Sequence, residues 1–138
     1  HKMSSGVNVD DSVVEEFNKL KMGKTLKYTI FKLSDDYNTI VVDKSAATAT
    51  YDDFIKALPE NDCRYGIYDF DYESDGGRRN KIVFVVWAPD SAKIKHKMLY
   101  ASSKDNIKKK LVGIGSEVQA TDASEIDYNA VLEKVSRG

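Results

Sequence analysis

The chain has 138 residues, a formal net charge of -1 at pH 7, 41% hydrophobic residues and 31% charged residues. One domain of this length can bury about two thirds of the surface that its unfolded chain exposes. The near-neutral charge argues against a general nucleic-acid-binding protein, because such domains are usually basic. No apolar run approaches the roughly 20 residues that a membrane span needs.

The first residues and the cysteine count bear on the boundaries and the compartment of the protein. His1 and Lys2 precede Met3, so we interpret residues 1–3 as a tag remnant and start methionine and residues 4–138 as a single domain. Residues 4–10 lack periodicity and are predicted to be a mobile lead-in. Cys63 is the single cysteine, which suits a reducing compartment, and no signal-peptide pattern opens the chain. We therefore expect a cytoplasmic protein.

The first half of the chain predicts a helix, a hairpin and a second helix. Ser12 and Glu15 form an S-x-x-E capping box before a helix that Gly23 ends. Two strands, 26–33 and 39–43, flank a polar turn. The residues expected to form the buried stripe of the first helix are Val13, Phe17 and Leu20. The second helix is capped by Thr50 with Asp53 at N3 and is stopped by Pro59.

The second half predicts a sheet core followed by a long basic helix. Residues 63–73 and 82–88 are predicted strands joined by a turn over 74–80, and the second strand is apolar enough to be covered on both faces. A helix is expected over 94–111, bent near 101–103 where Ser102 or Ser103 would cap its second half. A short strand at 117–121 and a last helix capped by Asp127 complete the chain. These elements predict an α/β protein of α+β type, with a central mixed sheet of about five strands sandwiched by helices on both faces.

The 94–111 helix concentrates charge that the rest of the chain lacks. Ile107 and Leu111 lie one turn apart and are expected to face the core, so that Asp105, Lys108 and Lys109 project from the opposite arc. An isolated KKK run is most simply a solvated helix end. Apolar and cationic neighbours upstream, together with a basic turn expected nearby, favour a protein interface instead. Those neighbours are Lys93, Lys95, His96, Lys97, Met98, Leu99, Arg78, Arg79 and Lys81.

Seven blocks of sequence between residues 4 and 137 resemble a known family. They are SSGV at 4–7, FNKLKMGK at 17–24, LPENDCRYGIYDFDY at 58–72, RNKIVFVVWAPD at 79–90, KMLYASSKDNIKKKL at 97–111, VQATDASE at 118–125 and VLEKVSR at 131–137. On these blocks the chain is similar to the cofilin and actin-depolymerising factor family, the single-domain members of the ADF-homology fold. The resemblance implies a mixed sheet between helices. It also implies a protein without covalent chemistry or cofactors that binds monomeric and filamentous actin, prefers ADP-bound subunits, changes filament twist, and severs and depolymerises filaments.

By matching positions, the resemblance implies two actin-binding surfaces. The surface for monomers and filaments would comprise Ser5, Gly6, Lys97, Met98, Lys104, Asp105, Lys108 and Lys109. The surface for filaments alone would comprise Arg79, Lys81, Glu133, Lys134 and Arg137. Some relatives carry Arg at positions 108, 109 and 134, so the ion pairs of this chain should be less demanding in geometry. Ser5 matches the serine on which the inhibitory phosphorylation of the family falls.

The remaining expectations concern other partners and rival functions. The lysine cluster should attract phosphatidylinositol bisphosphate, and a phosphoinositide-binding adaptor without severing activity is the alternative function. A Cys63–His96 nucleophile pair is conceivable, but the lysines that flank His96 argue against it. Tyr65, Tyr68 and Tyr72 resemble an RNA-stacking platform, but the acidic residues between them argue against RNA binding. We expect a monomer with no metal site. The basic nuclear insertion of animal members is absent, so nuclear entry by that route is not expected.

Overall fold

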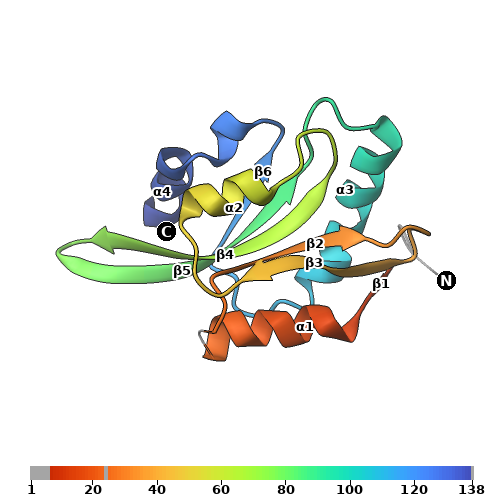
Figure 1. The fold of residues 1–138 in the computed structure, drawn as a ribbon. Helices are drawn as coiled ribbons and strands as arrows, with labels where there is room; N and C mark the ends of the chain where they lie inside the picture. The colour runs from red at the N-terminus through yellow and green to blue at the C-terminus, as the bar shows by residue number, and fades with distance from the viewer. Residues whose placement is uncertain (1–6, 24, 138) are drawn as a thin grey trace.

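The computed structural model describes residues 7–23 and 25–137. A six-stranded sheet in the order β1-β3-β2-β4-β5-β6 lies between two layers of helices (Figure 1). The strands are β1 (Asn8–Val9), β2 (Tyr28–Leu33), β3 (Thr39–Ala46), β4 (Arg64–Ser74), β5 (Gly77–Trp87) and β6 (Ser116–Ala120). The helices are α1 (Asp11–Asn18), η1 (Lys19–Gly23), α2 (Tyr51–Ala57), α3 (Ile94–Lys108), η2 (Ala123–Ile126) and α4 (Tyr128–Arg137).

The predicted α+β class and the mixed sheet between helices are confirmed. The two edge strands, β1 and β6, pair in parallel with β3 and β5, and the inner pairs are antiparallel. The sheet has six strands rather than about five, because Asn8 and Val9 pair with Thr39 and Ile40. The prediction of a mobile lead-in is therefore wrong for residues 7–10, since Val7 is also buried. Residues 4–6 lie outside the described residues.

Helix α1 begins differently from its predicted capping box. Asp10 is the N-cap, and its Oδ2 accepts a hydrogen bond of 3.1 Å from the Ser12 backbone N–H. Because the helix already starts at Asp11, Ser12 lies inside the first turn, where its amide needs an acceptor. The helix continues into the π-helical turn η1, which ends at Gly23 as predicted.

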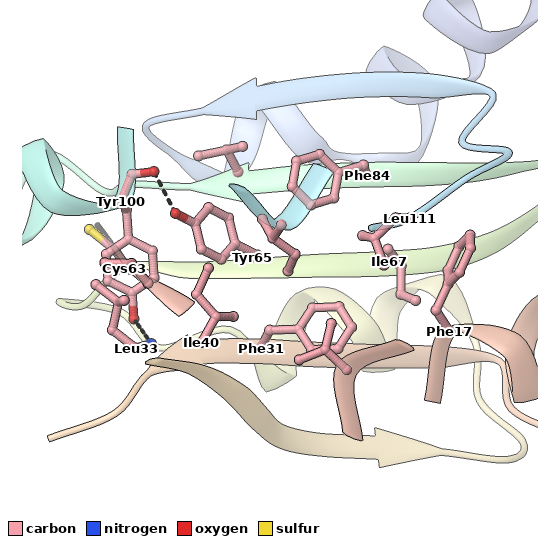
Figure 2. Packing of buried hydrophobic residues seen from close by; sticks show 14 of the residues in the cluster. Phe17, Phe31, Leu33, Ile40, Cys63, Tyr65, Ile67, Phe84, Tyr100 and Leu111 are labelled. Atoms are coloured by element: carbon pink, nitrogen blue, oxygen red, sulfur yellow. Dashed lines mark hydrogen bonds between the residues drawn. The ribbon is translucent and has the colours of Figure 1, made fainter. Parts of the chain in front are cut away.

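Two apolar layers fill the space on either side of the sheet. The layer under α1 and α3 contains the predicted stripe of α1 together with Ile107 and Leu111 (Figure 2). The layer under α2 and α4 contains an aromatic cluster around Phe54, against which β4 passes closely at Gly66. The capping box of Thr50 and Asp53 on α2 is confirmed. Residues 82–87 of β5 are all buried, as expected for a strand covered on both faces.

The hairpin of β4 and β5 is longer than predicted. The strands pair from Arg64↔Trp87 to Ser74↔Gly77, so the expected turn over 74–80 reduces to Asp75 and Gly76. These two residues have φ of 52° and 78°, the left-handed values that a tight two-residue turn requires. Arg79 is therefore a strand residue. The hairpin projects away from α3 (Figure 1), so its arginines do not lie near that helix as we expected.

Helix α3 runs without interruption from Ile94 to Lys108. The predicted cap at Ser102 or Ser103 is wrong, because both residues lie inside the helix and Ser103 is fully buried. Leu111 is buried as predicted, although it follows the helix rather than belonging to it. Asp127 caps α4 as expected, its Oδ1 accepting from the Ala130 N–H at 2.8 Å.

Candidate functional site

The outward face of α3 combines apolar and charged side chains. Ile94 and Met98 are 71% and 65% exposed in its first turns. Asp105, Lys108 and Lys109 are exposed at its other end, on the arc that the 100° spacing predicts. We use the name α3 surface for Lys97, Met98, Lys104, Asp105, Lys108 and Lys109. Five of these residues belong to α3 and Lys109 is its C-cap residue, and the side chains of Lys97 and Lys104 are half-buried.

Helix α3 is held against the sheet by two tyrosine hydroxyls (Figure 2). Tyr65 on β4 donates to the Tyr100 carbonyl at 2.5 Å, and the Tyr100 hydroxyl accepts from the Leu33 N–H at 2.8 Å. Both tyrosines are buried in the apolar layer that also contains Ile107. These contacts fix α3 relative to β2 and β4, so its surface residues project from a rigid support.

Two lysines of the α3 surface share one carboxylate. Lys104 Nζ lies 3.0 Å from Glu117 Oε2, and Lys108 Nζ bonds to Glu117 Oε1. Gln119 Nε2 also donates to Oε2, at 3.1 Å. Burial by itself would raise the pKa of the Glu117 carboxyl, but the hydrogen bonds from Lys108, Lys104 and Gln119 outweigh it and hold the pKa at about 2. The carboxyl is therefore ionised at neutral pH.

The upstream end of the α3 surface borders a groove. Lys97 Nζ donates to the Asp90 carbonyl at 3.2 Å. Lys97, Ala101 and Lys104 line one side of a cavity of about 210 Å³, and residues 119–121 of β6 and its following loop line the other. The Lys97 ammonium group therefore uses one of its donors for a hydrogen bond within the protein.

The N-terminal members of the predicted surface, Ser5 and Gly6, lie outside the described residues. The adjacent residue Val7 is buried, and its carbonyl accepts from Asn106 Nδ2 of α3 at 2.9 Å. Val7 is thus bound to the C-terminal half of α3.

The residues predicted for filaments alone come together on the β4–β5 hairpin and α4. Lys81 Nζ donates to the Val135 carbonyl at 2.8 Å, which ties β5 to the last turn of α4. Glu133 and Arg137 form an exposed ion pair of 3.3 Å, and Arg79 is exposed on β5. We use the name hairpin–α4 surface for Arg79, Lys81, Glu133, Lys134 and Arg137. It lies toward the end of the molecule opposite the start of α3 (Figure 1).

Sequence reasoning missed two features of the α3 region. Ile94 extends the apolar part of the exposed stripe, and its four-residue spacing from Met98 was a usable signal. Glu117 had no such signal, because the contact between β6 and α3 depends on the tertiary fold.

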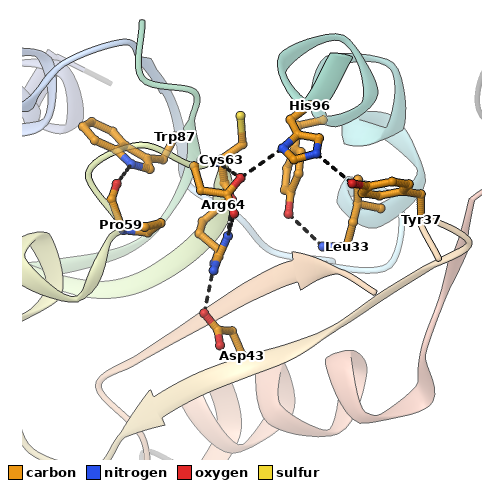
Figure 3. A network of polar contacts seen from close by, with 10 residues as sticks. Leu33, Tyr37, Asp43, Pro59, Cys63, Arg64, Trp87 and His96 are labelled. Carbon is orange, nitrogen blue, oxygen red and sulfur yellow. Dashed lines mark hydrogen bonds and ion pairs between the residues drawn. The ribbon is translucent and has the colours of Figure 1, made fainter. Parts of the chain in front are cut away.

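A polar network occupies the place where an enzyme site was considered (Figure 3). His96 Nε2 lies 2.8 Å from the Tyr37 hydroxyl and Nδ1 lies 3.4 Å from Asp62, so both ring nitrogens face groups other than the Cys63 thiol. Arg64 bridges Asp62 and Asp43 at 3.0 and 2.9 Å. Cys63 is fully buried, and burial raises the pKa of its thiol to about 11. His96 and Arg64 thus link neighbouring segments of the structure, and the contacts of His96 and the burial of Cys63 do not favour a nucleophile pair.

The described residues offer little to two rival kinds of function, metal binding and membrane insertion. Within 7–23 and 25–137, no group of three or more His, Cys, Asp or Glu side chains could hold a metal ion. Among the helices of the same residues, none is both long and apolar enough to cross a membrane.

Comparisons with known proteins agree with the observed fold. The family model described as "Cofilin/tropomyosin-type actin-binding protein" matches residues 6–136. A cofilin from Mycosarcoma maydis is 54% identical over 136 residues, covering 98% of both chains. Actophorin from Acanthamoeba castellanii is 53% identical over 134 residues, covering 96% of this chain and 97% of its own. The crystal structure of Streptomyces griseoflavus cofilin is 51% identical with a TM-score of 0.91, covering 96% of this chain and 99% of its own. The chain therefore belongs to the cofilin/tropomyosin-type actin-binding protein family.

Proposed function

We propose that this protein binds actin monomers and filaments, changes the twist of filaments, and promotes their severing and depolymerisation. Membership of the actin-binding family supports the partner. What supports the mechanism is that α3 lies apart from the β4–β5 hairpin and α4, the elements that carry the two proposed surfaces (Figure 1). Binding, and no covalent chemistry, is the proposed activity, with the cytoplasm as the expected place of action.

The α3 surface has the composition of a protein interface. Met98, with Ile94 beside it, offers apolar area that a partner can cover, and Lys108 and Lys109 offer charges to acidic side chains at its rim. Because these residues project from a helix fixed by Tyr65 and Tyr100, little backbone conformational entropy is lost on binding. We assign this surface to both monomers and filaments.

The hairpin–α4 surface supports a contact that only filaments provide. A ligand shifts a conformational equilibrium only by the difference in its affinity for the two states. If the two surfaces touch two neighbouring subunits at a spacing that the relaxed filament lacks, binding favours the altered twist. Severing then follows at boundaries between occupied and unoccupied stretches. The bond between Lys81 and the Val135 carbonyl suits this role, because it joins the hairpin to α4.

Ser5 is the proposed regulatory position. Phosphorylation would add about -1.5 to -2 charges, two positions before Val7, whose carbonyl is bound to Asn106 of α3. A negative charge in this part of the chain would oppose an acidic partner on the α3 surface. We expect Ser5→Asp to weaken actin binding strongly and Ser5→Ala to preserve it, as measured by monomer binding. Equal affinity of the two variants would contradict the switch.

Two double variants test whether the α3 surface and the hairpin–α4 surface have the separate roles proposed. Arg79→Ala/Lys81→Ala should abolish severing seen by microscopy and weaken filament co-sedimentation, while monomer affinity stays within about twofold of wild type. Lys108→Ala/Lys109→Ala should weaken both monomer and filament binding by about tenfold or more. Lys44→Ala/Lys56→Ala, which removes the same charge from exposed positions elsewhere, is the matched control. Equal losses of monomer and filament binding in the first variant would refute the separation.

Because Lys81 also bonds to the Val135 carbonyl, its replacement could move α4. Arg79→Ala alone removes an exposed guanidinium and leaves the bond between Lys81 and Val135 in place. It should reproduce most of the filament-specific loss. Retention of full severing by Arg79→Ala would assign the effect to a shifted α4 rather than to the hairpin.

We further propose that phosphatidylinositol bisphosphate competes with actin for the α3 surface. Exposed lysines near an anionic leaflet contribute about 1 kcal/mol each, and Lys108, Lys109 and Lys110 are exposed together. Vesicles that contain this lipid should displace the protein from actin, and less so as salt rises. Displacement that does not change with salt would contradict the proposal.

A further inference from the structure

The lysine pair Lys104 and Lys108 is arranged by a residue outside the predicted surface. The two lysines are four positions apart on α3, where like charges repel each other. Glu117, on the edge strand β6, lies between their ammonium groups and gives one carboxylate oxygen to each. Gln119 holds one of these oxygens in place from the same strand. The result is a cross-link between β6 and the last turns of α3.

The exposure of the three side chains decides what a partner can reach. The Glu117 side chain is 20% exposed, Lys104 is 24% exposed and Lys108 is 42% exposed. An acidic group that approaches α3 therefore meets Lys108 while Glu117 is still bound beneath it. An ammonium group has three N–H donors, so Lys108 can keep its bond to Glu117 and donate another to a second carboxylate. Glu117 thus need not be displaced on binding.

The Glu117 carboxylate also affects the net charge of the lysine pair and the freedom of its side chains. It cancels one of the two positive charges of the pair, which lowers the attraction for any diffuse negative surface. It also restricts two flexible side chains before a partner arrives, and this reduces the entropy lost on binding. A partner whose carboxylates match the fixed ammonium positions binds more tightly because the lysine side chains are already ordered. A fluid anionic surface gains nothing from fixed ammonium positions.

We propose that Glu117 is a positioning and specificity residue: it fixes Lys104 and Lys108 for the carboxylates of a protein partner and reduces their attraction to anionic lipid surfaces. The inference rests on the proposed function, because the protein partner is the actin assigned to the α3 surface. Glu117 itself makes no contact with the partner in this scheme. It acts through the two lysines.

Glu117→Gln tests the proposal, because it removes the charge and preserves the size of the side chain. We expect the variant to dissociate from actin monomers about three to ten times faster than wild type. Its affinity for vesicles of phosphatidylcholine with phosphatidylserine should rise about fivefold at low salt, the change expected for one added positive charge at an anionic surface. The opposite signs distinguish positioning from a loss of structure, which would weaken both interactions.

Two further variants complete the experiment. Glu60→Gln makes the same charge change at an exposed position outside both surfaces, and it should alter neither actin dissociation nor vesicle binding. Glu117→Asp keeps the charge on a shorter side chain, so vesicle affinity should stay at the wild-type level while dissociation from actin is accelerated.

The outcomes separate the two proposals. If wild-type protein binds actin and Glu117→Gln leaves the dissociation rate unchanged, or if vesicle affinity does not rise, the role of Glu117 is overturned and the proposed function stands. If wild-type protein fails to bind actin, the proposed function is overturned together with the partner assigned to this lysine pair.

Discussion

Replacing Tyr100 with Phe tests how firmly α3 is fixed to the sheet. The Tyr100 side chain is 4% exposed, and its hydroxyl accepts from the N–H of Leu33, a residue only 5% exposed. Tyr100→Phe leaves that buried donor without its acceptor, which costs about 1–3 kcal/mol of unfolding free energy. Tyr65→Phe should cost about 1 kcal/mol, because the Tyr100 carbonyl that loses this donor lies inside α3 and keeps its intrahelical partner.

Urea unfolding followed by the fluorescence of Trp87 measures the difference. With a denaturant slope of about 1–3 kcal/mol per molar, a loss of about 2 kcal/mol lowers the midpoint by about 1 M. Tyr128→Phe removes a hydroxyl from a side chain that is 44% exposed, and it should leave the midpoint unchanged. If Tyr65→Phe lowered the midpoint as much as Tyr100→Phe, the argument from an unsatisfied buried donor would be refuted.

Three more predictions concern stability. Gly66→Ala should lower the unfolding free energy by about 1–3 kcal/mol, because the new Cβ would lie 2.9 Å from two atoms of the fully buried Phe54 ring; an unchanged urea midpoint would contradict this. Thr50→Ala removes the side-chain cap of α2 and should cost about 1 kcal/mol, whereas Thr48→Ala, at an exposed position before the cap, should cost little in the same assay. The pKa of Glu117 is held at about 2, below its ordinary 4.5, so its ion pairs stabilise the fold above about pH 4.5 and this contribution is lost as the pH falls toward 2. The stability difference between wild type and Glu117→Gln, measured by urea unfolding at several pH values, should therefore shrink in acid; a difference that stays constant would argue against it.

The elements that could be predicted from the sequence are those whose signals are local. Thr50 and Asp53 cap α2 through contacts three residues apart, so their identity and spacing suffice. The buried run of β5 is apolar on both faces and needs no partner to be recognised as an inner strand. The outward arc of α3 follows from helical periodicity, and Lys108 and Lys109 are exposed where that periodicity places them.

Local signals were misleading where two interpretations satisfied the same pattern. Ser12 and Glu15 match a capping box, but Asp10 is as good a cap, and with β1 paired to β3 the N-cap lies two residues earlier, at Asp10. The glycines of the β4–β5 turn suggested a longer loop, yet the cross-strand ladder continues to Ser74↔Gly77. In each case backbone pairing between strands selected the observed boundary.

The sequence by itself determined the fold class, the apolar faces of the helices and the charged arc of α3, because each of these repeats with the period of its own backbone. Only the tertiary structure decided that Lys81 joins the hairpin to α4 and that Glu117 lies between Lys104 and Lys108. Lys81 and Val135 are 54 positions apart, and Glu117 belongs to a different element from the lysines that it binds. No periodicity within one helix or strand reports such contacts, since they depend on how the sheet brings separate elements together.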